Sequence, residues 1–92
     1  MKSILIIGLG RFGRHLCRKF MSLKNEVMIV DRDEAAVTAL ADEATSAQIA
    51  DCTDENALRA LGVKNFDLCF VCIGSDFASS LLITSMLKDM GA

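Results

Sequence analysis

Three glycines near the start of the chain have the spacing of a phosphate-binding turn. They follow an apolar run over residues 4–7 in the order Gly8-x-Gly10-x-x-Gly13, and a helical pattern begins immediately after them. In such a turn the first glycine permits the tight reversal, the second lets a pyrophosphate approach the backbone, and the third lets the helix pack closely on the strand. The free N–H groups at the helix start then face the anion. The spacing therefore predicts a site for the phosphates of a nucleotide.

An aspartate at the end of a second apolar run fits the same kind of site. Asp31 follows residues 26–30 and lies 18 residues beyond Gly13, close to the spacing of about 20 at which an acid meets the ribose of a dinucleotide. Its carboxylate would accept hydrogen bonds from ribose hydroxyls and repel a 2′-phosphate, which favours NAD, ATP or ADP over NADP. Arg32 weakens that exclusion slightly. The alternative interpretation of Asp31 is an ordinary turn residue.

Three further residues are candidates for ligand contacts. Arg11, inside the glycine motif, could fold over a phosphate as a bidentate donor, or it could be a solvated surface arginine. Asp51, after a third strand, could accept from an adenine amino group, or it could be a loop carboxylate. Gly74, after a fourth strand, would allow a ligand to approach across the crevice from Gly8.

The composition excludes several classes of protein. The chain has 92 residues, 52% of them hydrophobic, and a net charge of −2, which indicates one small packed domain without a nucleic-acid surface. Apolar runs are far shorter than the roughly 20 residues that span a bilayer, and no signal peptide is recognisable. We expect a cytosolic chain whose four cysteines are reduced.

The pattern of apolar residues alternates between strand and helix. Strands are expected over 3–7, 26–30, 46–50 and 67–73, and helices over 11–22, 34–43, 54–61 and from about 76 to 88. Asp33, Thr53 and either Ser75 or Asp76 are the expected N-caps, and Gly62 the expected stop signal. The fold class is α/β, a Rossmann-like parallel sheet with strands in the order 3-2-1-4. Because a fifth strand would normally follow, we expect a truncated domain.

The last predicted helix has apolar residues on more than one side. Residues 76–90 are apolar around most of the helix, so a second side should pack on a missing part of the domain or on another subunit.

Cys69 and Cys72 should face opposite sides of a strand and cannot share a metal. His15, the only histidine, is a surface residue on this interpretation. With no tyrosine, no nucleophile–base pair and no metal cluster, the sequence predicts a protein that is not an enzyme.

Taken together, the chain closely resembles the N-terminal part of a KTN/RCK (TrkA-N) domain, a regulatory domain of potassium channels and transporters. Four segments carry the resemblance: IGLGRFG at 7–13, VDRD at 30–33, ADCTD at 50–54 and DLCFVCIG at 67–74. The resemblance covers residues 1–92 and implies one Rossmann-like domain that would continue for two more strands and a helix. It implies that the motif containing Gly8, Gly10, Arg11, Phe12 and Gly13 holds phosphates.

The same resemblance implies roles for the remaining residues and partners. Asp31, with Arg32 beside it, would hold the ribose, while Asp51 and Cys52 would lie at the adenine. The ligand would be NAD(H), ATP or ADP, bound without turnover, and its exchange would gate a membrane potassium channel or transporter subunit. The last helix would contribute to a homodimer or higher oligomer at the cytoplasmic face of the membrane. Two alternatives remain: the cofactor-binding fragment of an NAD-dependent dehydrogenase, and an assembly module with a vestigial site.

Overall fold

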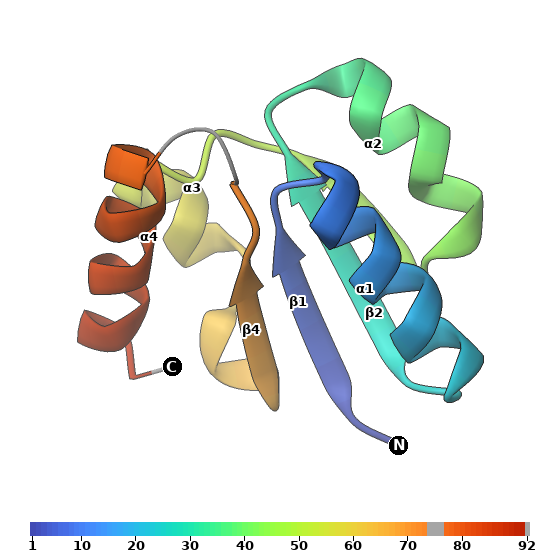
Figure 1. The fold of residues 1–92 in the computed structure, drawn as a ribbon. Coiled ribbons are helices and arrows are strands. Elements are labelled where there is room, and N and C mark those ends of the chain that lie inside the picture. Colours follow the sequence, from blue (N-terminus) through green and yellow to red (C-terminus); the bar gives the residue numbers. More distant parts are fainter. Residues whose placement is uncertain (74–76, 92) are drawn as a thin grey trace.

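The fold is built on a parallel sheet with helices packed against it (Figure 1). The computed structural model describes residues 1–73 and 77–91. The strands are β1 (Ser3–Ile7), β2 (Glu26–Asp31), β3 (Ser46–Ile49) and β4 (Leu68–Val71), in the spatial order β3-β2-β1-β4 (Figure 1). The predicted order 3-2-1-4 is therefore confirmed. Ile7 of β1 lies opposite both Val30 and Val71, so the carboxyl ends of the three strands are level.

Helices cover both faces of the sheet (Figure 1). On one face lie α1 (Arg11–Ser22) and α2 (Glu34–Leu40), and on the other lie α3 (Glu55–Ala60) and α4 (Phe77–Asp89). Short 3₁₀ turns follow α2 and α3, at Ala41–Glu43 and Val63–Asn65. The helix expected over 34–43 thus changes to 3₁₀ geometry at its end, where the side chain of Glu43 is held by Arg18 of α1 at 2.9 Å. A tightened last turn of this kind is common at helix ends.

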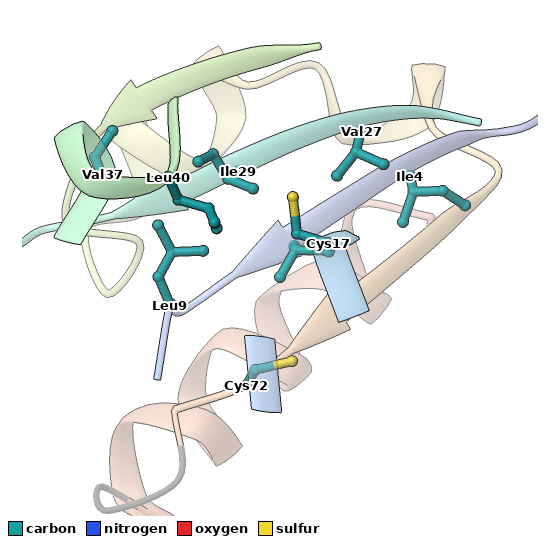
Figure 2. Close-up of a cluster of buried hydrophobic side chains, with 9 residues drawn as sticks. Ile4, Leu9, Cys17, Val27, Ile29, Val37, Leu40 and Cys72 are labelled. Atoms are coloured by element: carbon teal, nitrogen blue, oxygen red, sulfur yellow. The ribbon is translucent and has the colours of Figure 1, made fainter. Parts of the chain in front are cut away.

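The core consists of two apolar layers separated by the sheet. Alternate residues of β1 point to opposite faces, so Ile4 and Ile6 belong to one layer and Leu5 and Ile7 to the other. All four side chains are buried, as expected for a central parallel strand. Figure 2 shows the first layer, with Cys17 of α1 and side chains of α2 lying over β1 and β2. This packing fixes the start of α1 against the end of β1.

The helix starts match the sequence predictions at one position and correct them at another. Asp33 caps α2 as predicted, because its side chain accepts the N–H of Ala35 at 3.0 Å. The cap of α3 is Asp54, which accepts the N–H of Asn56 at 3.0 Å, so the prediction of Thr53 was wrong. Thr53 lies one residue before the cap, and its N–H and hydroxyl both donate to Asp51. The caps expected at Ser75 or Asp76 lie outside the described residues.

Replacing Asp54 with alanine is expected to lower the free energy of unfolding by about 1 kcal/mol, the usual effect of losing an N-cap. The cause is the orphaned N–H of Asn56 at the first turn of α3. Urea denaturation followed by circular dichroism measures the change. The control is Asp54→Asn, which keeps a capping oxygen and should unfold near the wild-type midpoint; equal losses in both variants would contradict the capping role.

The end of β4 and the two cysteines beside it also differ in detail from the sequence expectation. The strand was expected over 67–73 but ends at Val71, although the N–H of Cys72 still donates to the carbonyl of Ile7 at 2.7 Å. Cys72 packs into the layer under α1, whereas Cys69 packs into the opposite layer, so the two thiols face different sides as predicted. Among residues 1–73 and 77–91, no His, Cys, Asp or Glu side chains are grouped so as to hold a metal ion.

The last helix has an apolar outer side. Ile83 and Leu87 are buried against the sheet, while Leu81 and Leu82 are 59% and 47% exposed. The described part of the chain thus covers one side of α4 and leaves the other apolar side open, in agreement with the sequence pattern. No helix in the described part of the chain combines the length and apolar character that crossing a membrane requires.

Candidate functional site

The three glycines of the glycine turn, residues 8–13, differ in whether the fold requires them. Gly8 has φ +98°, and a Cβ there would lie 2.9 Å from the backbone of Cys72. A Cβ on Gly13 would collide with the carbonyl oxygen of Gly8. Gly10 has the ordinary φ of −66°, and among the described residues a Cβ there would meet only the Cys72 carbonyl oxygen, at 3.9 Å. The fold itself therefore demands glycine at 8 and 13, whereas at Gly10 it leaves space that a side chain could fill.

The carboxylate of Asp31 is tied to the glycine turn. Its Oδ2 accepts the N–H of Leu9 at 2.8 Å, and its Oδ1 accepts the N–H of Asp33 at 2.9 Å. The backbone carbonyl of Asp31 also accepts the N–H of Ala50, at 3.0 Å, in the connection after β3. Asp31 is half-buried at the end of β2, and each carboxylate oxygen retains acceptor capacity for a further donor.

A second carboxylate, Asp51, lies where β3 ends. Its Oδ1 accepts both the N–H of Thr53, at 3.0 Å, and the Thr53 hydroxyl, at 2.6 Å. These hydrogen bonds, first that of the hydroxyl, lower the pKa of Asp51, and the nearby positive charge of Arg32 lowers it further. Asp51 is therefore ionised at neutral pH and fixed in orientation. Its other oxygen, Oδ2, takes no part in the contacts with Thr53.

A cavity of about 220 Å³ lies at the carboxyl ends of β1, β2 and β3, beside the glycine turn. In open parallel sheets this is the position at which ligands bind. Six of the ten residues predicted for a nucleotide site line it: Gly8, Gly10, Asp31, Arg32, Asp51 and Cys52. The structure thus brings the predicted ribose and adenine residues to the same cavity as the first two glycines.

Of the other four predicted residues, three do not line the cavity and one is not among the described residues. Gly13 is buried beneath the turn, and its contribution is the close packing of α1 on Gly8. Arg11 and Phe12 are exposed on the first turn of α1 and do not line the cavity; the Phe12 side chain is 62% exposed. Gly74 lies outside the described residues.

Several lining residues were not among the predicted site residues. They are Leu9, Thr53, Cys72, Ile73, Ser79 and other apolar residues of the strand ends. One signal was present: Asp51 and Thr53 are two residues apart, a spacing at which an aspartate binds its own backbone two residues on. Contacts of Cys72 with Gly8, in contrast, depend on pairing of β4 with β1 and have no local signature.

The described charges that line the cavity are those of Asp31, Asp51 and Arg32, and two arginines at the start of α1 lie outside its lining. The first turn of α1 holds Arg11 and Arg14 and no acidic residue, so its cations add to the positive end of the helix dipole. Asp31 and Asp51 lie at the ends of β2 and β3, on the other side. An elongated ligand that is anionic at one end and rich in hydroxyl and amino donors at the other matches this distribution.

The thiol of Cys52, between the two acids, is held protonated. Burial raises its pKa from 9.0 to about 11, and the negative charges of Asp51 and Asp31 contribute. Burial likewise raises the pKa of Cys69 and Cys72, and of Cys17, where Glu43 adds to the effect. A thiol with a raised pKa is a poor nucleophile, so Cys52 can line the cavity without offering a reactive thiolate.

These shifts predict a loss of stability in alkali. The unfolded chain releases its thiol protons near the ordinary pKa of 9.0, before the folded chain does, so the free energy of unfolding should fall as pH rises from 9.0 to about 11. Urea denaturation across this range measures the slope. Cys52→Ala should show a shallower slope than the wild type, and an identical slope in the two proteins would contradict the role of Cys52.

Comparison with known proteins identifies the family to which the chain belongs. The model of the TrkA-N domain family matches residues 4–92. Potassium uptake protein A of the Ktr system from Bacillus subtilis is 43% identical over 89 residues, covering 97% of this chain and 40% of that protein. The Ktr protein C of the same organism is 43% identical over 90 residues, covering 98% of this chain and 41% of that protein. The chain thus spans about two fifths of the length of these relatives.

Solved structures give the same result for the fold. The NAD(P)-binding domain of an exopolyphosphatase-related protein from Archaeoglobus fulgidus superposes with a TM-score of 0.79 at 30% identity, over 97% of this chain and 66% of that one. A UDP-glucose-4-epimerase from Stenotrophomonas maltophila, solved with bound NAD, has a TM-score of 0.76 at 20% identity over 100% of this chain and 35% of its own, which shows likeness of fold alone. From the family match over residues 4–92 and the 43% identity to the Ktr proteins, the chain belongs to the TrkA-N domain family.

Proposed function

We propose that this chain is the nucleotide-binding part of a regulatory component of potassium transport, and that its cavity binds an adenine nucleotide, NAD(H) or ATP/ADP, as a signal. The observation that carries the nucleotide site is Gly10. Its φ of −66° does not require glycine, nor do its surroundings in residues 1–73 and 77–91, yet it lines the cavity at the start of α1. A residue without a side chain at that point is what close approach of a pyrophosphate to the backbone needs.

In the proposed complex, the phosphates lie over the start of α1. The first-turn amides of a helix have no partners within the helix and point outward, and the absence of a side-chain cap at Gly10 leaves that end accessible. Arg11 lies on the same turn and is exposed, so its guanidinium can fold over a bound phosphate as a paired donor. Gly8 and Gly13 contribute indirectly, by giving the turn its shape.

The nucleoside would extend from the turn towards the ends of β2 and β3. Ribose hydroxyls would donate to Asp31, and the adenine amino group to the Asp51 oxygen that Thr53 does not contact. Cys52, protonated and buried, would supply an apolar surface beside the base. A 2′-phosphate would lie against the Asp31 carboxylate, which disfavours NADP; Arg32 offsets part of that repulsion.

The regulatory part of the proposal rests on the relatives and on the chemistry of the cavity. The Ktr proteins, at 43% identity, are named as potassium uptake proteins, and this chain covers about two fifths of their length. Among the described lining residues there is no histidine, lysine or tyrosine to act as a general acid or base. A ligand that is bound and not converted can act by favouring one conformation of the protein.

The partners would be a membrane potassium channel or transporter subunit and further copies of the chain. In this proposal the protein is cytoplasmic and peripheral to the membrane through that subunit. The open side of α4, with Leu81 and Leu82, would form the contact between copies in a homodimer or larger assembly. Residues 1–92 would then be the N-terminal part of a single nucleotide-binding domain.

Isothermal titration calorimetry with NADH, NAD, ATP, ADP and NADP tests the nucleotide proposal. We expect saturable binding of at least one of the first four, and NADP weaker than NAD. Absence of binding by all five would refute the nucleotide site for this chain. Consumption of NADH in the presence of a 2-oxo acid would instead support an oxidoreductase.

A further inference from the structure

The side chain of Asp31 extends the pairing of β1 with β2 beyond the ends of the strands. The N–H of Gly8 donates to the carbonyl of Val30 at 2.8 Å, and this is a backbone contact. The next amide along the chain, that of Leu9, donates at 2.8 Å to the Asp31 carboxylate. Leu9 is thus the first residue of the glycine turn whose amide is not bonded to the carbonyl of a strand, and the Asp31 carboxylate accepts that amide instead.

Both groups in this contact are held in place from elsewhere. The Leu9 side chain is only 4% exposed and packs in the layer containing Val37 and Leu40, so its backbone has little freedom. The Asp31 carboxylate is fixed in orientation because its other oxygen accepts the N–H of Asp33 at 2.9 Å. Asp31 thus connects the glycine turn to the start of α2 through two hydrogen bonds, one on each oxygen.

We propose that Asp31 is a positioning residue for the phosphate site, in addition to any contact with ribose. Its carboxylate holds the glycine turn in the shape that receives phosphates, so loss of the carboxylate weakens binding of a phosphate ligand that has no ribose. The inference about phosphate affinity rests on the proposed nucleotide site. The inference about the turn itself concerns the chain without ligand and stands independently.

Asparagine at position 31 separates positioning from electrostatics. Asp31→Asn leaves one acceptor oxygen for two N–H donors, so either Leu9 or Asp33 faces an NH₂ group. It also removes a negative charge near the phosphates, which by itself would strengthen binding of an anion. Positioning and simple charge repulsion therefore predict changes of opposite sign. Asp33→Asn is the matched control, because it removes the same charge nearby and keeps a capping oxygen for Ala35.

The experiment is an NMR titration of the isotope-labelled chain with tripolyphosphate and, separately, with adenosine. For tripolyphosphate we expect Asp31→Asn to weaken binding about tenfold or more, the effect of one buried amide left without an acceptor, while Asp33→Asn changes it about twofold or less. A contact with ribose alone predicts weaker binding of adenosine only. Unchanged or tighter binding of tripolyphosphate to Asp31→Asn would overturn the positioning role.

Two measurements without ligand complete the test. In the wild type, a scalar coupling across the hydrogen bond should connect the Leu9 amide nitrogen to the Asp31 side-chain carboxyl carbon, and its absence would overturn the inference even if Asp31→Asn fails to fold. Hydrogen exchange of the Leu9 amide should be about tenfold faster or more in Asp31→Asn than in Asp33→Asn. If the wild type binds none of the nucleotides in calorimetry, the proposed function fails, while these two measurements still decide the role of Asp31 in the turn.

Discussion

Replacing Gly10 with alanine is expected to weaken nucleotide binding and leave the fold intact. The φ of −66° and ψ of −171° at Gly10 are accessible to any residue, and within the described part of the chain an added Cβ would meet only the Cys72 carbonyl oxygen, at 3.9 Å. Alanine is a poorer N-cap than glycine, which lowers the free energy of unfolding by up to about 1 kcal/mol. Alanine also lowers the entropy of the unfolded chain, which raises the free energy of unfolding by a similar amount. The free energy of unfolding should therefore change by less than about 1 kcal/mol.

The same methyl group occupies the space that the proposal gives to a pyrophosphate. Overpacking of a close contact costs about 1–3 kcal/mol, which corresponds to a loss of affinity of roughly 5- to 150-fold. Calorimetry measures the affinity, and urea denaturation of the same sample measures the stability. The chain lacks tryptophan and tyrosine, so circular dichroism is the suitable probe of unfolding.

Gly62→Ala is the control for this experiment. Gly62 has φ +70° at the end of α3 and is absent from the lining of the cavity. Alanine in that conformation costs about 1–2 kcal/mol of stability and should leave nucleotide affinity unchanged. The two variants are thus expected to show opposite patterns, one losing affinity and the other stability. Wild-type affinity in Gly10→Ala would contradict the placement of phosphates at the glycine turn.

The sequence predicts the sheet well because its signals are local. Continuous apolar runs identify β1 and β2, and alternation with helical patterns implies parallel strands with crossover connections. The glycine motif indicates the dinucleotide-binding topology, in which the strand order is 3-2-1-4. Asp33 was recognisable as a cap because the acid directly precedes a helical pattern. Thr53 was mistaken for the next cap because Thr53 and Asp54 are both capping residue types, and only the hydrogen bond that Asp54 accepts from Asn56 decides between them.

The candidate site was only partly predictable, because its contacts join residues distant in sequence. The spacing of Gly8 and Asp31 predicts that both lie near a ligand, but it does not predict that Asp31 accepts the N–H of Leu9. Nor does it separate Gly10, which the fold does not need, from Gly13, which it does. Both distinctions depend on how closely α1 and β2 approach the end of β1. They determine which substitutions should affect binding and which should affect folding.

Gly13→Ala is expected to give the largest loss of stability among these substitutions. A Cβ at position 13 would collide with the carbonyl oxygen of Gly8. Because this oxygen belongs to the backbone, it cannot move aside as the end of a flexible side chain can. Gly8 itself has little freedom, since its N–H donates to the carbonyl of Val30 at 2.8 Å and the backbone of Cys72 lies 2.9 Å from where a Cβ on Gly8 would be. The strain can be relieved only if α1 moves away from β1.

Such a movement of α1 would open the apolar layer in which Cys17 packs on Ile4 and Ile6. Overpacking alone costs about 1–3 kcal/mol, and the lost packing adds to it, so we expect at least about 3 kcal/mol, a large fraction of the 5–15 kcal/mol that stabilises a typical domain. Urea denaturation followed by circular dichroism measures the loss. Arg14→Ala, on the exposed side of the same helix, is the control and should change stability by about 0.5 kcal/mol or less. If Gly13→Ala unfolded at the wild-type midpoint, the close approach of α1 to Gly8 would be wrong, and with it the distinction between Gly13 and Gly10 from which the nucleotide site is inferred.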